Sequence, residues 1–119
     1  MRDMVKPLKA LSDEIRLRIL NLLLERECCV CEVVQALNIS QARASRNLKI
    51  LYDAGFLNLR YDGLWSLYSI DKKGMAEYQL RLTDVVQKAM EGNELAAADK
   101  ARLGKSKRIG AEYVGRNQN

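Results

Sequence analysis

The chain has 119 residues, 48% of them apolar, and a formal net charge of +5. This length is typical of one domain with a small core, and the positive charge favours an acidic partner such as nucleic acid. Histidine is absent, which excludes imidazole general bases, Ser-His-Asp triads and every zinc site that needs His. Neither a membrane-spanning apolar run nor a secretory leader is recognisable, so we expect a cytoplasmic protein without a membrane partner.

Two helices are predicted in the first 25 residues. The first is short, begins or is interrupted near Pro7 and ends before Ser12, with apolar positions at Met4, Val5, Leu8 and Leu11. Ser12 is expected to cap the second helix, where Asp13 and Glu14 suit the positive end of the helix dipole. The second helix is predicted to lie in the core, since its apolar positions are Ile15, Ile19, Leu20, Leu22, Leu23 and Leu24.

The next two helices have the spacing of a helix-turn-helix. A third helix is predicted over Cys31–Leu37, and a fourth is capped by Ser40 and ends at Gly55. The fourth helix has an apolar stripe, formed by Ala44, Leu48, Leu51 and Tyr52, opposite a basic face without carboxylates. We expect this helix to be the DNA recognition helix. Its basic face would contact DNA bases through Gln41, Ser45 and Arg46, and phosphates through Arg43 and Lys49.

After Gly55 the apolar pattern alternates with a period of two. Asp62-Gly63 between the alternating segments predicts a β-hairpin, which after a recognition helix is the wing of a winged helix. Arg60 on this wing is expected to reach a DNA phosphate.

Asp71 is expected to cap a further helix that runs to Gly92. We expect its stripe to pack against a second subunit, through Met75, Tyr78, Leu82, Val85, Val86 and Ala89.

These elements predict a mainly α fold with a small β-hairpin. The predicted class is a dimeric winged helix-turn-helix with the element order α-α-α-α-β-β-α. Residues 1–103, which include a weaker helix capped by Asn93, are predicted to form the DNA-binding and dimerisation domain. Residues 104–119 are predicted to form a basic, disordered tail.

Three cysteines lie within four residues, at Cys28, Cys29 and Cys31. Bridges between such close neighbours cannot form a disulfide framework, so we expect ligating or reactive thiols, or else small buried core residues. Thiolates without imidazole favour thiophilic ions such as arsenite, antimonite or a soft heavy metal over zinc. Cys28 and Cys31 also form a Cys-x-x-Cys pair, but a thioredoxin-like redox site requires a βαβ pattern that is not present.

Four segments resemble the ArsR/SmtB family of metal-responsive winged-helix repressors over roughly residues 5–90. They are Leu11 to Leu20, Glu27 to Val33, Ser40 to Leu48, and Gly55 through Asp62-Gly63 to Tyr68. Within the family the chain is most similar to arsenic sensors, whose hallmark of Cys-Val-Cys and an acidic residue appears as Cys29-Val30-Cys31-Glu32. Where many of these sensors have a third Cys, this chain has Val34, and it has an additional Cys28.

The resemblance implies a homodimer that represses genes from a palindromic double-stranded operator and leaves the DNA when As(III) or Sb(III) binds. It implies no enzyme activity and no cofactor for DNA binding. We predict that Cys28, Cys29 and Cys31 bind one arsenic on an irregular backbone, because neither a helix nor a strand brings three such sulfurs together. A two-sulfur site at Cys29 and Cys31 is the alternative. A thiol redox protein, either a sensor or a reductase, is the alternative function.

Overall fold

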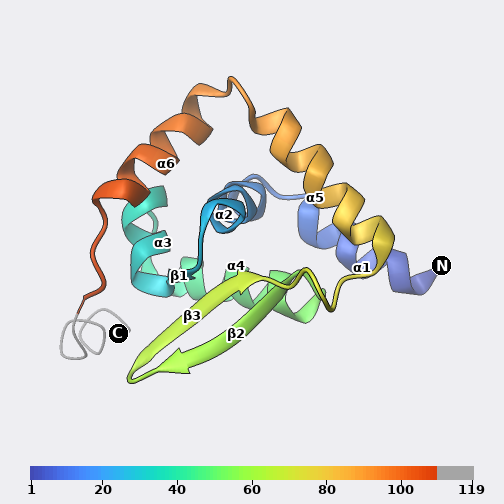
Figure 1. Cartoon of the computed structure of the whole chain (residues 1–119), viewed down its shortest axis with the longest axis horizontal. Helices are drawn as coiled ribbons and strands as arrows, with labels where there is room; N and C mark the ends of the chain where they lie inside the picture. Colours follow the sequence, from blue (N-terminus) through green and yellow to red (C-terminus); the bar gives the residue numbers. More distant parts are fainter. Residues whose placement is uncertain (110–119) are drawn as a thin grey trace.

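The computed structural model describes residues 1–109, which form six helices and a three-stranded antiparallel sheet that lies along one side of the helices (Figure 1). The helices are α1 (Arg2–Leu11), α2 (Glu14–Glu25), α3 (Val30–Leu37), α4 (Gln41–Asp53), α5 (Glu77–Met90) and α6 (Glu94–Lys105). The strands are β1 (Cys28–Cys29), β2 (Leu57–Asp62) and β3 (Trp65–Ile70). The predicted winged helix-turn-helix is therefore confirmed. The predicted element order had five helices and two strands, and so omitted one helix and β1.

Helix α2 is the centre of the core, as its apolar sequence predicts. It contacts all five other helices and is seen nearly end-on in the middle of Figure 1. Ile19, Leu20 and Leu22 are completely buried, together with Phe56 at the start of the wing. Within residues 1–109, no helix combines the length and apolarity that crossing a membrane requires.

The first two helices begin differently from the prediction. Helix α1 continues through Pro7, and its end at Leu11 is as predicted. The predicted Ser12 cap of α2 is wrong, because the Asp13 carboxylate accepts the hydrogen bond from the Arg16 N–H, at 3.1 Å. The Ser12 hydroxyl instead donates to the Leu8 carbonyl, which completes α1. Each side chain therefore satisfies a backbone group of a different helix.

The helix-turn-helix is formed by α3, a left-handed turn residue and α4. Asn38 takes φ of +56°, a conformation that Asn tolerates better than most residues, and allows the chain to reverse. Ser40 caps α4 through its hydroxyl, which accepts from the Arg43 N–H, as predicted. Ala44, Leu48 and Leu51 are completely buried, which confirms most of the predicted inward face of α4, but Tyr52, the fourth predicted member, is 43% exposed.

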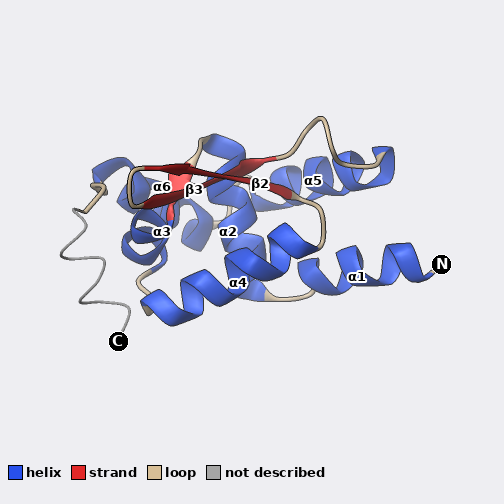
Figure 2. Ribbon diagram, turned by 90° about the horizontal axis from the view of Figure 1, so that it is seen from below, coloured by secondary structure: helices blue, strands red, loops and turns tan. Residues whose placement is uncertain are grey.

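The wing is the β2–β3 hairpin, which extends past the helices at the lower edge of Figure 1 and lies across them in the view from below (Figure 2). Its turn is formed by Gly63 and Leu64 rather than by the predicted Asp62-Gly63, since Asp62 pairs with Trp65. Gly63 takes φ of +61°, which the absence of a Cβ permits. Strand β1 adds to the free edge of β3, with Cys28 opposite Tyr68 and Cys29 opposite Leu67. The cysteine segment is thus joined directly to the wing.

Helix α5 begins later than predicted. Asp71 accepts from the Gly74 N–H in a separate turn, and α5 starts at Glu77 after an Ala76 cap. The face that α5 buries in this chain contains Gln79, Thr83 and Val86, whereas Val85 from the predicted stripe is 61% exposed. The predicted stripe was therefore wrong in part, because Met75 precedes α5 and Val86 is buried within this chain, whereas Val85 stays exposed, as a face for a second subunit requires.

Helix α6 is capped by Asn93, as predicted, and extends two residues beyond the predicted end at Leu103. Its buried Asp99 anchors it to the core, since the carboxylate accepts two hydrogen bonds from the Arg18 guanidinium of α2, both at 2.8 Å. Residues 104 and 105 of the predicted tail belong to this helix, and residues 106–109 continue along the molecular surface. The rest of the predicted tail, residues 110–119, lies outside the described residues.

Candidate functional site

Two of the three cysteines meet where β1 becomes α3. Cys29 is extended and forms the N-cap of α3, while Cys31 is the second residue of that helix. This junction is irregular, as the three-sulfur hypothesis requires, and it brings the Sγ atoms of Cys29 and Cys31 together in a disulfide. The bridge closes a loop of only three residues, so it does not staple distant parts of the chain. In their reduced form the two thiols would form a preorganised pair.

Cys28 lies on the opposite face of β1, because neighbouring residues of a strand point to opposite sides. It is completely buried in the main core and donates its thiol hydrogen to the Arg26 carbonyl. Burial raises the pKa of the Cys28 thiol to about 12, which keeps it protonated at neutral pH. No group of three Cys, His, Asp or Glu suited to a metal is found in the described part of the chain. The geometry therefore favours the two-sulfur site.

The Cys29 sulfur also supports the first turn of α3. It accepts a hydrogen bond from the Glu32 N–H at 3.3 Å, and the Glu32 carboxylate accepts one from the Cys29 N–H at 2.9 Å. This reciprocal pair is a capping box in which a sulfur replaces the usual hydroxyl. A ligand that moves the Cys29 sulfur would therefore act directly on this cap.

Glu32 connects the cysteine junction to two arginines. Its buried carboxylate lies 2.8 Å from the Arg26 guanidinium and 3.2 Å from that of Arg108. Burial alone would raise the pKa of Glu32, but hydrogen bonds from Arg26, the Cys29 N–H and Arg108 outweigh it and hold the pKa below its usual value. Glu32 therefore stays ionised beside the cysteines.

Replacing Glu32 with Gln is expected to lower the free energy of unfolding by about 1.5–3 kcal/mol at pH 7, because charge-assisted hydrogen bonds are lost. Since the folded-state pKa of Glu32 is depressed, its contribution is present above pH 4.5, the reference pKa, and is lost as the pH falls through the lower folded value. Urea denaturation from pH 7 to pH 3 measures this. A difference between parent and variant that does not shrink below pH 4.5 would show that Glu32 is not held ionised.

The segment after α6 covers the cysteine pair, which the sequence did not predict. The Arg108 guanidinium lies over the Trp65 ring at 5.8 Å, and the Trp65 indole N–H donates to the Ile109 carbonyl at 2.7 Å. Lys107 exchanges two backbone hydrogen bonds with the Gln35 side chain. Ile109, Trp65 and Leu67 pack around Cys29 and Cys31 as a second apolar cluster. The one sequence signal was Trp65, whose indole N–H needs an acceptor when it is partly buried.

A partly open hollow of about 110 Å³ lies beside the cysteine pair. Its walls come from the cysteine junction, the start of the recognition helix and the wing. They are Cys29, Val30, Cys31, Gln41, Ser45, Leu64, Trp65, Ser66 and Tyr68. Two predicted DNA-contacting residues, Gln41 and Ser45, therefore line the same hollow as the two sulfurs.

The predicted DNA-contacting side chains differ in their exposure and in whether they already form ion pairs within the chain. Arg43 and Arg46 are exposed on α4, and Gln41 and Ser45 are half-buried. Lys49 is exposed but pairs with Asp53 at 2.9 Å. Arg60 pairs with Glu27 through two hydrogen bonds, of 2.8 and 2.7 Å.

Asn47, between these residues on α4, points inward instead. Its side-chain oxygen accepts from the Arg16 guanidinium at 3.0 Å, and its amide donates to the Arg43 carbonyl. Asn47 therefore links the recognition helix to α2.

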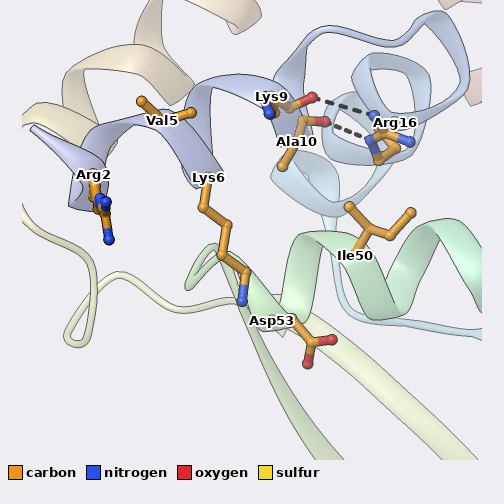
Figure 3. Close-up of a pocket in the computed structure, with 8 residues that line it drawn as sticks. All are labelled: Arg2, Val5, Lys6, Lys9, Ala10, Arg16, Ile50 and Asp53. Atoms are coloured by element: carbon orange, nitrogen blue, oxygen red, sulfur yellow. Dashed lines mark hydrogen bonds between the residues drawn. The ribbon is translucent and has the colours of Figure 1, made fainter.

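A larger hollow of about 500 Å³ lies between α1 and α4 (Figure 3). Its lining residues are Arg2, Val5, Lys6, Lys9, Ala10, Arg16, Ile50 and Asp53. The Arg16 guanidinium donates to the Ala10 and Lys9 carbonyls at 2.6 and 3.2 Å. No sulfur lines this hollow, so despite its size it is not the thiol site, and its cations extend the positive surface beside α4.

Comparisons with known proteins agree with this arrangement. Residues 13–58 match the family described as "Bacterial regulatory protein, arsR family". The arsenic resistance transcriptional regulator ArsR2 of Pseudomonas putida is 36% identical over 94 residues, which cover 78% of each chain. The cadmium resistance transcriptional regulatory protein CadC homolog of Staphylococcus aureus is 41% identical over 70 residues, and the chain spans only 58% of its length.

A solved structure has the same fold. It is the homodimeric winged helix-turn-helix DNA-binding domain of a possible ArsR-family regulator from Mycobacterium bovis, with a TM-score of 0.64 and 29% identity. The match covers 78% of this chain and 82% of that domain. Both the family match and the fold are those of transcriptional regulators rather than enzymes. The chain therefore belongs to the ArsR family of winged helix-turn-helix transcriptional regulators.

Proposed function

We propose that this protein is an arsenite- and antimonite-responsive repressor that binds a palindromic operator as a homodimer and releases it when As(III) or Sb(III) binds Cys29 and Cys31. The observation that carries the proposal is the shared hollow, in which both cysteines face the same space as Gln41 and Ser45 of the recognition helix. Two thiolates without imidazole suit a thiophilic ion. The relative named for arsenic resistance supports this choice of inducer.

The DNA interface would be the exposed face of α4 together with the wing. We propose that Gln41, Ser45 and Arg46 contact bases and that Arg43, Lys49 and Arg60 contact phosphates. Lys49 and Arg60 must exchange their partners, Asp53 and Glu27, for phosphates or share them. Both ion pairs are largely exposed, so this exchange costs little.

A second subunit would cover apolar side chains that this chain leaves exposed. Met4, Val5 and Leu8 on α1 are each about 42% exposed, and Val85 on α5 is 61% exposed. The Tyr78 hydroxyl of α5 donates to the Asp3 carbonyl of α1, so the two helices form one continuous surface. The homodimeric M. bovis domain supports a dimer, and a two-fold dimer would match a palindromic site.

Release would follow from the change at the N-cap of α3. Arsenic bonded to both sulfurs would fix the position of the Cys29 sulfur, which accepts from the Glu32 N–H, and would thereby shift the first turn of α3. The group that completes the arsenic coordination would lie near the hollow shared with α4 and the wing. The rearranged state would bind arsenic more tightly and DNA less tightly than the original state. Arsenic binding would therefore shift the population towards the state that does not bind DNA.

Arsenite titration of a reduced protein–operator complex tests the proposal, with a duplex selected from a randomised library as operator. Release by about one arsenite per subunit is expected, whereas zinc at micromolar free concentration should cause no release, since His is absent and the described residues contain no three-ligand group for a metal. Zinc-driven release from intact, reduced protein would contradict the proposed site. Release only upon oxidation would support the alternative of a redox sensor.

Arg46→Ala is expected to weaken operator binding by about 1–3 kcal/mol and to relax base preference, because Arg46 is exposed on α4 and has no carboxylate partner among the described residues. Fluorescence anisotropy with the selected duplex and single-base variants measures this. Lys100→Ala, on α6 outside both the DNA-contacting and the dimer surface, is the control and should leave affinity unchanged. Equal affinities for the parent and the Arg46 variant would remove Arg46 from the interface.

A further inference from the structure

A third hollow, of about 240 Å³, lies at the corner where α5 turns into α6. Both helices contact α2, which lies beneath this corner in Figure 1. The walls of this α5–α6 hollow include Asn21 of α2, Met90 and Glu91 at the end of α5, and Ala96, Ala97 and Lys100 of α6. Neither the cysteines nor the proposed DNA-contacting residues line it. The proposed function therefore leaves this hollow unused.

The inner wall of the α5–α6 hollow carries an unpaired amide. Asn21 is only 1% exposed, yet its side-chain nitrogen has no hydrogen-bond partner in the described part of the chain. A buried N–H without an acceptor destabilises the folded state, and native proteins rarely leave one unpaired. One ordered water would satisfy this nitrogen but would occupy only about a tenth of the hollow. The remaining space admits a small molecule that brings its own acceptor.

The inner part of the hollow favours a neutral group over a charged one. Besides Asn21, its most buried lining residues are Ala96 and Met90, and neither side chain carries a charge or donates a hydrogen bond. A carboxylate placed beside them would lose its hydration without gaining a counter-charge. A neutral carboxamide suits Asn21 better, because its carbonyl accepts from the Asn21 amide while its own N–H donates to the Asn21 oxygen.

The outer part of the hollow offers charges of both signs. Glu91 is exposed and forms no ion pair among residues 1–109, and it follows the negative end of the α5 dipole. Lys100 lies 3.2 Å from Glu25, but both side chains are at least 40% exposed, so this pair exchanges partners at little cost. The N-terminus of α6 adds partial positive charge at the same corner. These groups suit the ammonium and the carboxylate of a zwitterion.

We infer that the α5–α6 hollow binds a free α-amino acid whose side chain ends in a neutral carboxamide, the class that includes glutamine. The ligand carboxamide pairs with Asn21, and its methylene groups contact Met90 and Ala96. Its ammonium group faces Glu91 and its carboxylate faces Lys100. Binding breaks no covalent bond, and it requires neither the cysteines nor arsenic.

Titration of the full-length protein with L-glutamine tests the inference, with L-glutamate and L-leucine as controls. Glutamine is expected to release or absorb heat in a calorimeter and, at millimolar concentration, to raise the urea midpoint, since it binds only the folded state. Glutamate and leucine should bind at least about tenfold more weakly. Glutamate would bury a charge beside Asn21, and leucine would leave the Asn21 amide unpaired.

Asn21→Leu separates ligand binding from a structural role of Asn21. Leucine removes the unpaired amide and adds apolar burial, so the urea midpoint without ligand should rise. The response to glutamine should disappear in the same variant. A purely structural Asn21, satisfied by water, predicts the opposite on both counts: a lower midpoint and an unchanged effect of glutamine.

Ala97→Met fills the hollow from an exposed position of α6 and leaves Asn21 in place. It should weaken glutamine binding at least about tenfold, because the added side chain occupies the space of the ligand. Ala101→Met, one turn further along α6, is also exposed but lies outside the hollow and should bind glutamine as the parent does. This pair decides the question even if Asn21→Leu fails to fold.

Three results would overturn the inference. They are no heat and no midpoint shift with glutamine, equal shifts with all three amino acids, and equal glutamine binding by the Ala97 and Ala101 variants. The first would mean that the hollow holds water only, and the second that the effect is one of solutes in general. None of these results bears on arsenite-driven release, so the proposed function stands or fails separately.

Discussion

Replacement of Cys29 or Cys31 with Ser is expected to abolish arsenite-driven release, shifting the half-effective arsenite concentration by at least about 100-fold. Loss of one of two sulfurs leaves a single As–S bond, which free thiols compete away. Operator affinity should remain within about twofold, because Ser is a strong N-cap residue and can accept the Glu32 N–H in place of the Cys29 sulfur. Anisotropy titration of the reduced variants on the selected operator measures both quantities.

Cys28→Ala is the matched control for these variants. Cys28 lies in the main core, and its thiol is kept protonated by a pKa of about 12. The Cys28 variant should therefore keep the arsenite response, with some loss of stability from the small cavity. If Cys28→Ala loses the response while remaining folded, the three-sulfur site is correct and the chain must rearrange to bring Cys28 to the metalloid.

Asp99→Ala is expected to lower the free energy of unfolding by about 3–5 kcal/mol, the range typical of breaking a buried ion pair. Asp99 is completely buried, and it accepts hydrogen bonds from Arg18 and also from Arg102, at 2.7 Å. Removing the carboxylate leaves the Arg18 guanidinium, whose side chain is only 13% exposed, without its partner. Urea denaturation monitored by circular dichroism measures the loss.

Glu77→Ala is the control for the Asp99 variant, because it removes a solvent-exposed ion pair instead of a buried one. Glu77 and Arg81 pair on the surface of α5 with both side chains more than three-quarters exposed, so less than about 0.5 kcal/mol should be lost. Similar losses in the Asp99 and Glu77 variants would mean that α6 is not anchored through Asp99. Because α6 leads into the segment that covers the cysteines, the Asp99 variant also tests whether that segment stays in place.

The helix-turn-helix and the wing could be predicted because their signals are local. The Ser40 cap, the apolar period of α4 and the glycine near the hairpin turn each act within a few residues. The prediction of the α2 cap was wrong because two neighbouring side chains can cap the same helix. Ser12 and Asp13 can both cap α2, and only the folded backbone decides between them.

The cysteine site was predictable in composition but not in geometry. Clustering of the thiols indicates a ligand role, whereas the pairing of β1 with β3 decides which thiols meet, and that pairing joins residues about 40 positions apart. The same limit applies to the covering segment, since the contact between Trp65 and Ile109 spans 44 residues. Non-local contacts of this kind have no sequence period from which to infer them.

X-ray absorption at the arsenic edge, recorded on the one-to-one arsenite complex whose operator affinity is measured in the same sample, tests the central claim most directly. Small thiols are removed after reduction, so that solvent oxygen is the only added donor. The account then predicts two sulfurs, from Cys29 and Cys31, and one oxygen per arsenic, together with loss of operator binding. Arsenic without sulfur neighbours, or a two-sulfur complex that still binds the operator with full affinity, would contradict the account.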